Sequence, residues 1–242
     1  MNKNILSVNA DAKTSKGEKL GFLTGILYLA PANTTKYNVC SMAATAKCAE
    51  PCLYKAGRGA FNSVQQARIA KTIRFFEDRE AFMSDVVFSI RSLQRKAAKL
   101  GLTPLVRLNG TSDIRWERVP LIVDGVKYDN IMSVFPDVLH YDYTKDINRT
   151  DLPSNYDLTF SYSGVAEFQP YVDKAVAKGM RLAVVFRHAA QIPLTFKGIN
   201  VVSGDDSDVR HLDDQGVVVG LYACLVSPSD AADCPPLYAV GC

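Results

Sequence analysis

The stretch Gly21-Phe-Leu-Thr-Gly-Ile-Leu-Tyr-Leu-Ala30 is almost continuously apolar, and Pro31 follows it at once. A strand that is buried on both faces of a parallel sheet has this composition, because neither of its faces meets water. Proline is typical of the end of such a strand, since it has no N–H to donate to the ladder. We therefore expect a first strand here, with the next loop leaving from its carboxyl end.

Further short apolar runs follow along the chain, and helical patterns lie between several of them. The other predicted strands cover residues 103–108, 138–143, 156–161, 181–186, 199–202 and 217–222. Strands that alternate with helices form right-handed βαβ units and a parallel sheet. The number of strands favours an incomplete (β/α) barrel over a Rossmann sheet, and no Gly-rich dinucleotide fingerprint follows the first strand. A Rossmann-type sheet stays open as the alternative.

Helices are expected between these strands. Apolar residues recur three or four positions apart from Phe82 to Ala97, which predicts a helix over about 79–100 that ends at Gly101. Ser63 is a candidate N-cap for the helix before it. Shorter helical patterns cover 128–135 and 165–178.

The expected organisation is a single α/β domain over residues 20–223, with an N-terminal arm at 1–19 and a tail at 224–242 that carries cysteines. The chain has 242 residues of which 48% are hydrophobic, enough for a sizeable core. Its net charge of +3 permits contact with nucleic acid but does not argue for it. No apolar run has the length of a membrane span, and residues 1–19 lack the apolar region of a signal peptide. We therefore expect a cytoplasmic protein without membrane contact, whose thiols stay reduced.

Three of the six cysteines, Cys40, Cys48 and Cys52, lie in one segment, residues 40–59, which we call the Cys loop. Thiolates bind soft metal centres, and both iron–sulfur clusters and zinc usually take four ligands. Three ligands from one loop leave the fourth place to a distant residue or a small molecule. In a reducing compartment, grouped cysteines indicate metal binding or catalysis before disulfides. The alternative is that all three are small buried apolar side chains.

Polar residues follow every predicted strand, and ligands of parallel α/β folds bind outside the carboxyl ends of strands. Asn109, Ser112 and Asp113 follow the second strand and are the candidate ligand-binding residues. The others are Asp142, Thr144 and Lys145; Ser161, Ser163 and Glu167; Arg187 and His188; and Gly204, Asp205, Asp206, Asp208 and Arg210. Asn109 and Ser112 could instead form a turn and a helix cap. Trp116 packs against this turn or stacks on a ligand, and the three histidines, His140, His188 and His211, show no ligand spacing and are interpreted as structural.

The remaining cysteines, Cys224, Cys234 and Cys242, are widely spaced. They could supply a fourth cluster ligand, a second metal site, a disulfide or nothing.

The first strand, the Cys loop with its ending at 52–54, and the alternating strands and helices resemble a divergent radical S-adenosylmethionine (radical SAM) protein. The spacing of the cysteines differs from the usual pattern of that superfamily. The resemblance implies a partial α/β barrel in which Cys40, Cys48 and Cys52 hold a [4Fe-4S] cluster. Its open iron would bind S-adenosylmethionine, with Asn109, Ser112 and Asp113 near the amino and carboxyl groups or the ribose of that cofactor.

Blocks spread over nearly the whole chain resemble more closely a family of phage proteins, the mycobacteriophage gene product 88 group. They are the cysteines with residues 56–58, and the segments 107–113, 116–117, 135–137, 140–145, 158–161, 184–186, 203–205 with Asp208 and Arg210, and 219–221. This family implies no particular reaction. If the protein is phage-encoded, its compartment is the cytoplasm of the host cell.

We therefore expect an iron–sulfur cluster-binding protein of phage type, either a radical-SAM-like enzyme whose substrate the sequence does not specify or a protein without that activity. The alternative is a non-enzymatic module, stabilised by zinc or a cluster, that binds a host protein or nucleic acid. Metal content separates the two classes first.

Overall fold

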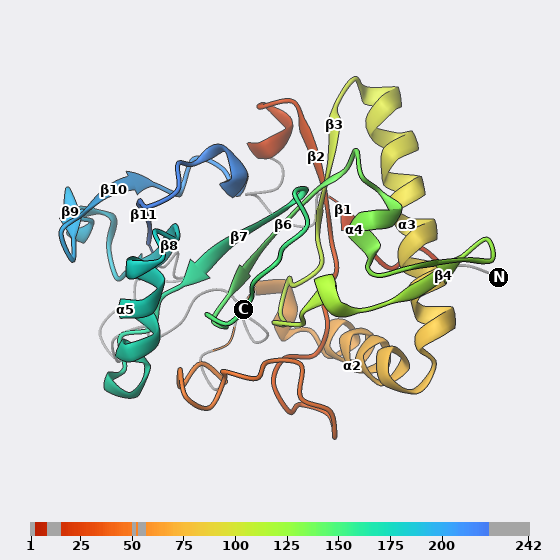
Figure 1. Cartoon of the computed structure of the whole chain (residues 1–242), viewed down its shortest axis with the longest axis horizontal. Helices are drawn as coiled ribbons and strands as arrows, with labels where there is room; N and C mark the ends of the chain where they lie inside the picture. Colours follow the sequence, from red (N-terminus) through yellow and green to blue (C-terminus); the bar gives the residue numbers. More distant parts are fainter. Residues whose placement is uncertain (1–2, 9–15, 50–51, 53–56, 223–242) are drawn as a thin grey trace.

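Seven parallel strands, each close to a predicted range, form the body of a nine-stranded sheet (Figure 1). The computed structural model describes residues 3–8, 16–49, 52 and 57–222. In spatial order the parallel strands are β2 (Phe22–Ile26), β3 (Thr103–Arg107), β6 (Leu139–Thr144), β7 (Tyr156–Ser161), β8 (Leu182–Phe186), β11 (Val218–Tyr222) and β10 (Ile199–Ser203). The apolar runs thus predict these strands correctly, because burial on both faces leaves a local signal in the sequence.

The first five of these strands follow one another in the sheet in the order of the chain, and β11 then lies between β8 and β10. A short antiparallel strand lies at each edge of the sheet: β1 (Ser7–Val8) pairs with β2, and β9 (Thr195–Phe196) pairs with β10. The chain is therefore a mixed α/β domain with a large, mostly parallel sheet.

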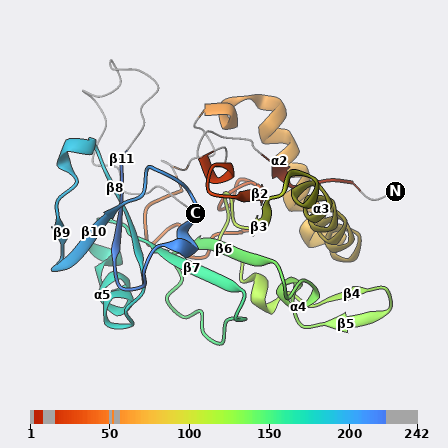
Figure 2. The same cartoon turned by 90° about the horizontal axis from the view of Figure 1, so that it is seen from above.

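Helices cover one face of the sheet, which we call the helix-covered face (Figures 1 and 2). These helices are α3 (Arg79–Leu100), α4 (Ile131–Val134) and α5 (Gln169–Ala177). Helix α2 (Asn62–Glu77) lies beyond the carboxyl end of β2, where Thr72 Oγ1 accepts from the Ala30 N–H at 2.8 Å. Leu23 and Val106 of the strands belong to the same buried cluster as Leu93 of α3. Gly25 allows this close packing, because an added Cβ would lie 2.9 Å from Cδ2 of Leu93.

The observed ends of α2 and α3 can be compared with the capping residues expected from the sequence. Helix α3 has the predicted bounds, and Gly101 follows it in the left-handed conformation at φ 67°. The interpretation of Ser63 as an N-cap is wrong: α2 begins at Asn62, and its N-cap, Phe61, makes no side-chain cap bond. The carbonyl of Phe61 instead accepts from the backbone N–H of Val64 and Gln65, so Ser63 lies inside the first turn.

Part of the predicted 128–135 helix is a strand. Strands β4 (Leu121–Val123) and β5 (Val126–Tyr128) form a separate hairpin beside α3 (Figure 2). Within the range predicted as a helix, only Ile131–Val134 is helical. The hairpin turns at Asp124 and Gly125, both with positive φ. Asp-Gly is a strong hairpin signal, but the flanking runs are too short to stand out from the sequence.

The opposite face of the sheet carries Arg107, Tyr141, Tyr143 and Ala183 and is packed by the segment 204–213, so we call it the loop-covered face. Val209 from that segment packs against Tyr141 in a small cluster separate from the main core. Buried polar side chains, such as that of Arg107, are frequent on this face.

Residues 3–8 differ from the loose arm that was expected. The backbone N–H groups of Lys3 and Ile5 donate to Asp85 Oδ1 at 2.8 Å and to Ser89 Oγ at 2.9 Å, so this segment is fastened to α3. Cys224, Cys234 and Cys242 lie outside the described residues. No helix in the described part of the chain is both long and apolar enough to cross a membrane.

Candidate site at the carboxyl edge of the sheet

The Cys loop lies across the carboxyl ends of the central strands. Asp113 N–H, just beyond β3, donates to the Val39 carbonyl at 2.8 Å, and Ser163 Oγ, just beyond β7, donates to the Ala46 carbonyl at 2.9 Å. Cys40 Sγ lies 4.0 Å from the Thr111 carbonyl oxygen. The loop and the candidate ligand-binding turn are therefore in contact, as expected for a site at this edge.

The three cysteines of this loop are thiols and not disulfides. Cys40 and Cys48 are each 2% exposed, and Cys52 is half-buried. Cys40 Sγ accepts a hydrogen bond from Ala32 N–H at 3.4 Å. Tight turns between Cys40 and Cys48 give this part of the loop a fixed shape, because the Ala43 and Cys48 N–H groups donate to carbonyls inside it.

A soft metal centre fits these residues in chemistry and in location, but not in arrangement. Thiols are the donors that iron–sulfur clusters and zinc prefer. Within residues 3–8, 16–49, 52 and 57–222, however, no three His, Cys, Asp or Glu side chains are grouped so that they could hold a metal ion. Cys40, Cys48 and Cys52 therefore do not form a ligand set as they lie here, and both metal interpretations stay predictions.

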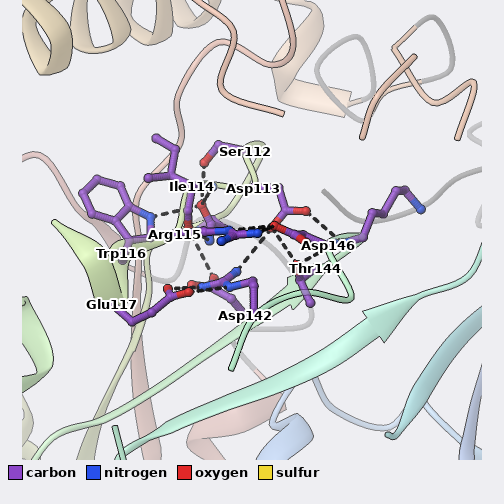
Figure 3. A network of polar contacts seen from close by, with 12 residues as sticks. Ser112, Asp113, Ile114, Arg115, Trp116, Glu117, Asp142, Thr144 and Asp146 are labelled. Atoms are coloured by element: carbon purple, nitrogen blue, oxygen red, sulfur yellow. Dashed lines mark hydrogen bonds and ion pairs between the residues drawn. The ribbon is translucent and has the colours of Figure 1, made fainter. Parts of the chain in front are cut away.

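Asn109 is the centre of the turn after β3, from which Figure 3 shows Ser112, Ile114 and Trp116. Its Oδ1 accepts from Ser112 Oγ at 2.9 Å, Ile114 N–H at 2.9 Å and Trp116 Nε1–H at 3.0 Å. Its Nδ2 donates to the Ile114 carbonyl at 3.0 Å. Asn109, Ser112 and Trp116 are fully buried. The side chain of Asn109 thus holds the turn and anchors Trp116, so of the two alternatives for Trp116 the structure shows the one in which it packs against this turn. Ligand contact by Asn109 or Ser112 stays a prediction.

Asp113 joins the end of β3 to the end of β6. Its Oδ1 accepts from Thr144 Oγ1 at 2.9 Å and its Oδ2 from Lys145 N–H at 2.8 Å. Arg149 Nη1 also lies 3.3 Å from Oδ1. Burial raises the pKa of the Asp113 carboxyl, and the positive charge of Arg149 opposes this shift. Asp113 is therefore a buried link between strands that also borders the Cys loop.

Arg149 extends this network across the helix-covered side of the edge. Its guanidinium makes two hydrogen bonds to the carboxylate of Glu117, the Nε one at 2.9 Å. Its Nη2 also donates to the Tyr156 hydroxyl at 3.0 Å, which in turn donates to Asp142 Oδ2 at 2.9 Å. Such two-pronged pairs fix geometry as well as charge. Neither Glu117 nor Arg149 was predicted as a site residue, since nothing local in the sequence pairs them.

Asp142 on β6 is the most deeply placed carboxylate of the edge. Asn109 N–H donates to its Oδ1 at 2.8 Å. Burial raises the pKa of Asp142 to about 7, against the opposing effects of Arg107 and of these hydrogen bonds. A carboxyl group with a pKa near neutrality is suited to proton transfer, although ion networks that only stabilise a fold also shift pKa values.

Other residues singled out in the sequence differ in burial and in the partners they contact. Asp208 reaches the edge and pairs with Arg107 at 2.8 Å, and Glu167 pairs with Lys47 of the Cys loop at 2.6 Å. Arg187 and His188 are exposed beyond β8. His140 is fully buried with Nδ1 3.0 Å from the Val138 carbonyl oxygen, in agreement with a structural role.

The fold and this edge define a mixed α/β protein with a polar site at the carboxyl ends of a mostly parallel sheet. A sequence profile of the Gene product 88 family matches residues 4–234, so the chain belongs to this family of phage proteins. The family resemblance seen in the sequence is thereby confirmed. Comparison with curated proteins gave no match, and comparison with solved structures gave none. The radical SAM resemblance therefore has no support from relatives.

Proposed function

We propose that this protein binds an iron–sulfur cluster through Cys40, Cys48 and Cys52 at the carboxyl edge of the sheet. The observation that carries the proposal is the course of the Cys loop. It follows the segment that leads away from β2, lies over the ends of β3 and β7, and brings Cys40 Sγ to 4.0 Å from the Thr111 carbonyl oxygen. A cofactor held by this loop would border Asp113, at the edge where parallel sheets bind their ligands.

The proposal requires the three thiols to be drawn together when the cluster binds. Metal sites are often incomplete without their metal, and binding then supplies free energy that organises the loop. Cys48 and Cys52 are joined by a segment of which residues 50 and 51 are not described, and residues 53–56 follow Cys52. Cys52 is the thiol that would have to approach the other two, because the turns between Cys40 and Cys48 already hold that part of the loop.

A finer proposal is that the protein is a radical-SAM-like enzyme on a partial barrel. The order of β2, β3, β6, β7 and β8, which follows the chain, supports this interpretation. The cluster would supply one-electron chemistry, while this chain would bind and orient the second cofactor. The three residues expected to contact S-adenosylmethionine already have partners within the chain, Asn109 with Ser112 and Asp113 with Thr144, so contact with the cofactor would have to replace or share these hydrogen bonds.

The first experiment is purification without oxygen, followed by iron, sulfide and zinc analysis and an absorption spectrum. We expect a brown protein with four irons. Cys40→Ala, Cys48→Ala and Cys52→Ala should each remove the cluster, whereas the matched variant Cys224→Ala should keep it. One equivalent of zinc, with no iron or sulfide after anaerobic reconstitution, would show that the cluster proposal is wrong and would favour the non-enzymatic module that binds a host protein or nucleic acid.

The second experiment addresses S-adenosylmethionine alone. Added to the reduced cluster, it should change the electron paramagnetic resonance spectrum if one iron is open to it. A change that appears only after Cys234 or Cys242 is replaced would mean that a distant thiol closes the site, and the enzyme proposal would then be abandoned while the cluster proposal stands.

A further inference from the structure

A groove lies between α3 and the β4–β5 hairpin, and we call it the hairpin groove. Figure 1 shows the hairpin crossing α3, and Figure 2 shows it extending away from the sheet. The groove has a volume of about 290 Å³. The lining residues that bear on what it can bind are Val87, Phe88, Arg91 and Arg95 of α3 and Ile122 and Asp124 of the hairpin.

Part of this lining is apolar. Val87 is buried and Phe88 is half-buried on α3, whereas Ile122 on β4 is 62% exposed. Side chains alternate along a strand, so Ile122 points away from the face on which Leu121 and Val123 are buried. A large aliphatic side chain that lines a groove and stays in water is surface that a partner can bury.

The rest of the lining is mainly basic. After Asp85, helix α3 has four cations and no acid: Arg91, Arg95, Lys96 and Lys99. Arg91 and Arg95 are four residues apart, so they lie one turn from each other on the same face of the helix. On the hairpin, Lys127 is exposed and pairs in register with Ile122. The apolar part of the groove is therefore bordered by positive charge from both elements.

Contacts within the chain leave this charge largely uncompensated. Arg91 Nη2 lies 2.9 Å from Asp124 Oδ2, but both side chains are exposed, and such surface pairs contribute little free energy. Arg95 Nη2 donates to Ser92 Oγ at 2.9 Å, and no carboxylate of the described residues forms an ion pair with Arg95. Residues 86–100 and 121–129 together carry five cations against two acids, Asp124 and Asp129.

Helix stability alone does not explain these arginines. Cations stabilise a helix through its dipole when they lie in the last turn, which here contains Lys99. Arg91 and Arg95 come before that turn, and they are on the side of the helix that lines the groove. Their position therefore indicates a surface that attracts negative charge.

We infer that the hairpin groove is a docking site for a peptide segment of a partner protein, one that carries Asp or Glu beside Leu, Ile or Phe. An apolar side chain of the peptide would lie between Phe88 and Ile122, and its carboxylates would face Arg91 and Arg95. Charge complementarity of this kind steers the encounter and selects the partner. The inference is independent of the cluster proposed at the Cys loop, so either can fail alone.

A peptide suits this groove better than the other classes of ligand. Sites for small molecules usually have volumes of roughly 300–1,000 Å³, so this groove is at the lower limit and fits a few side chains rather than a whole cofactor. Proteins that hold single-stranded nucleic acid stack its bases on aromatic side chains. The exposed apolar side chain here is Ile122, which is aliphatic and gives no such platform.

The test is a selection of random dodecapeptides on the purified full-length protein. The enriched peptides are then synthesised and titrated by fluorescence anisotropy at physiological ionic strength. We expect them to combine Asp or Glu with large apolar residues. Arg95→Gln and Ile122→Thr should each weaken their binding about fivefold or more. Both positions are exposed, and threonine keeps the β-branched shape that suits a strand, so the fold should persist.

Two matched variants are the controls. Lys96→Gln removes the same charge as Arg95→Gln from the next residue of α3, which is exposed but outside the groove lining, and should leave the affinity unchanged. Leu194→Thr removes an apolar side chain that is 90% exposed elsewhere on the molecule, and should also have no effect.

Equal losses in Lys96→Gln and Arg95→Gln would show that only net charge matters, and the inference would be wrong. It would also be wrong if no peptide is enriched, if the enriched peptides lack acidic residues, or if a single-stranded oligonucleotide binds in their place. Protein with and without iron should bind the peptides alike, which separates this result from the outcome for the cluster.

Discussion

Asp113 Oδ1 and Arg149 Nη1 lie 3.3 Å apart although the two residues are separated by 36 positions, and their side chains are 3% and 1% exposed. This buried pair joins the turn after β3 to the loop after β6. The carboxylate also accepts from Thr144 and from Lys145 N–H, so its removal would leave three donors short of an acceptor.

We therefore expect Asp113→Ala to lower the free energy of unfolding by about 3 kcal/mol, since breaking a buried ion pair leaves an uncompensated charge. Urea denaturation measures this. Asp113→Asn keeps the shape and one acceptor and should cost less. A helix-cap role would predict a loss of only about 1 kcal/mol, but η3 (Trp116–Arg118) has Arg115 as its N-cap and no side-chain cap bond. A loss as small as that would contradict the network described here.

Asn109→Ala should destabilise the fold by about 2 kcal/mol or more, because buried donors of Ser112, Ile114 and Trp116 lose their common acceptor. Trp116 is the only tryptophan, so its fluorescence reports on this turn directly. We expect the native emission of the variant to shift to longer wavelength as water reaches the indole. A matched change outside the turn, Asn148→Ala, should leave the emission as it is. An unshifted spectrum in Asn109→Ala would show that Trp116 is held by packing alone.

The parts of this fold that could be predicted are those with a local signal. Buried strands such as β8 are continuous apolar runs, and the end of α3 at Gly101 follows from one residue type. The pairing of Glu117 with Arg149 has no local signal, because it depends on how β3 and β6 lie side by side. The grouping of polar residues at the carboxyl edge was predictable from topology, whereas the commitment of Asn109 to its own turn required side-chain geometry.

His140 predicts an acid-dependent loss of stability. Burial lowers the pKa of its imidazole to about 4, and its Nε2 has no hydrogen-bond partner among the described residues. Between pH 6.5 and 4 the imidazole is protonated in the unfolded chain but not in the folded chain. The free energy of unfolding therefore falls as the pH falls through this window. The size of the effect is roughly 3 kcal/mol.

Because carboxylates titrate in the same range, the measurement is the difference between variants. Denaturation curves of wild type and His140→Asn should diverge from pH 4 to 6.5, with the wild type losing more stability on acidification. His188→Asn, at an exposed position, should follow the wild type. Parallel curves for wild type and His140→Asn would mean that the buried imidazole accepts its proton in the folded state.

The cysteines can be separated by their burial. In metal-free protein, Cys40→Ala removes a buried side chain and should cost about 1 kcal/mol, whereas Cys52→Ala, at a half-buried position, should cost less. If all three thiols hold a cluster, both variants nevertheless lose the iron completely. Iron analysis and denaturation of the same preparations make this comparison. Retention of iron in Cys52→Ala would exclude Cys52 from the ligand set.

Lys71 predicts that stability depends on pH in the alkaline range. Burial, and then the like charge of Arg68, lower its pKa to about 8, below the ordinary 10.5, so the unfolded chain binds more protons between these values. Stability should therefore rise from pH 8 to 10.5 as the folded protein ceases to hold an unfavourable charge, and Lys71→Met should lack this rise. Because other lysines and tyrosines titrate in the same range, the measurement is the difference between the urea denaturation curves of wild type and variant. Lys96→Met, at an exposed position of α3, should follow the wild type. Parallel curves for wild type and Lys71→Met would mean that the buried amine keeps its proton in the folded state.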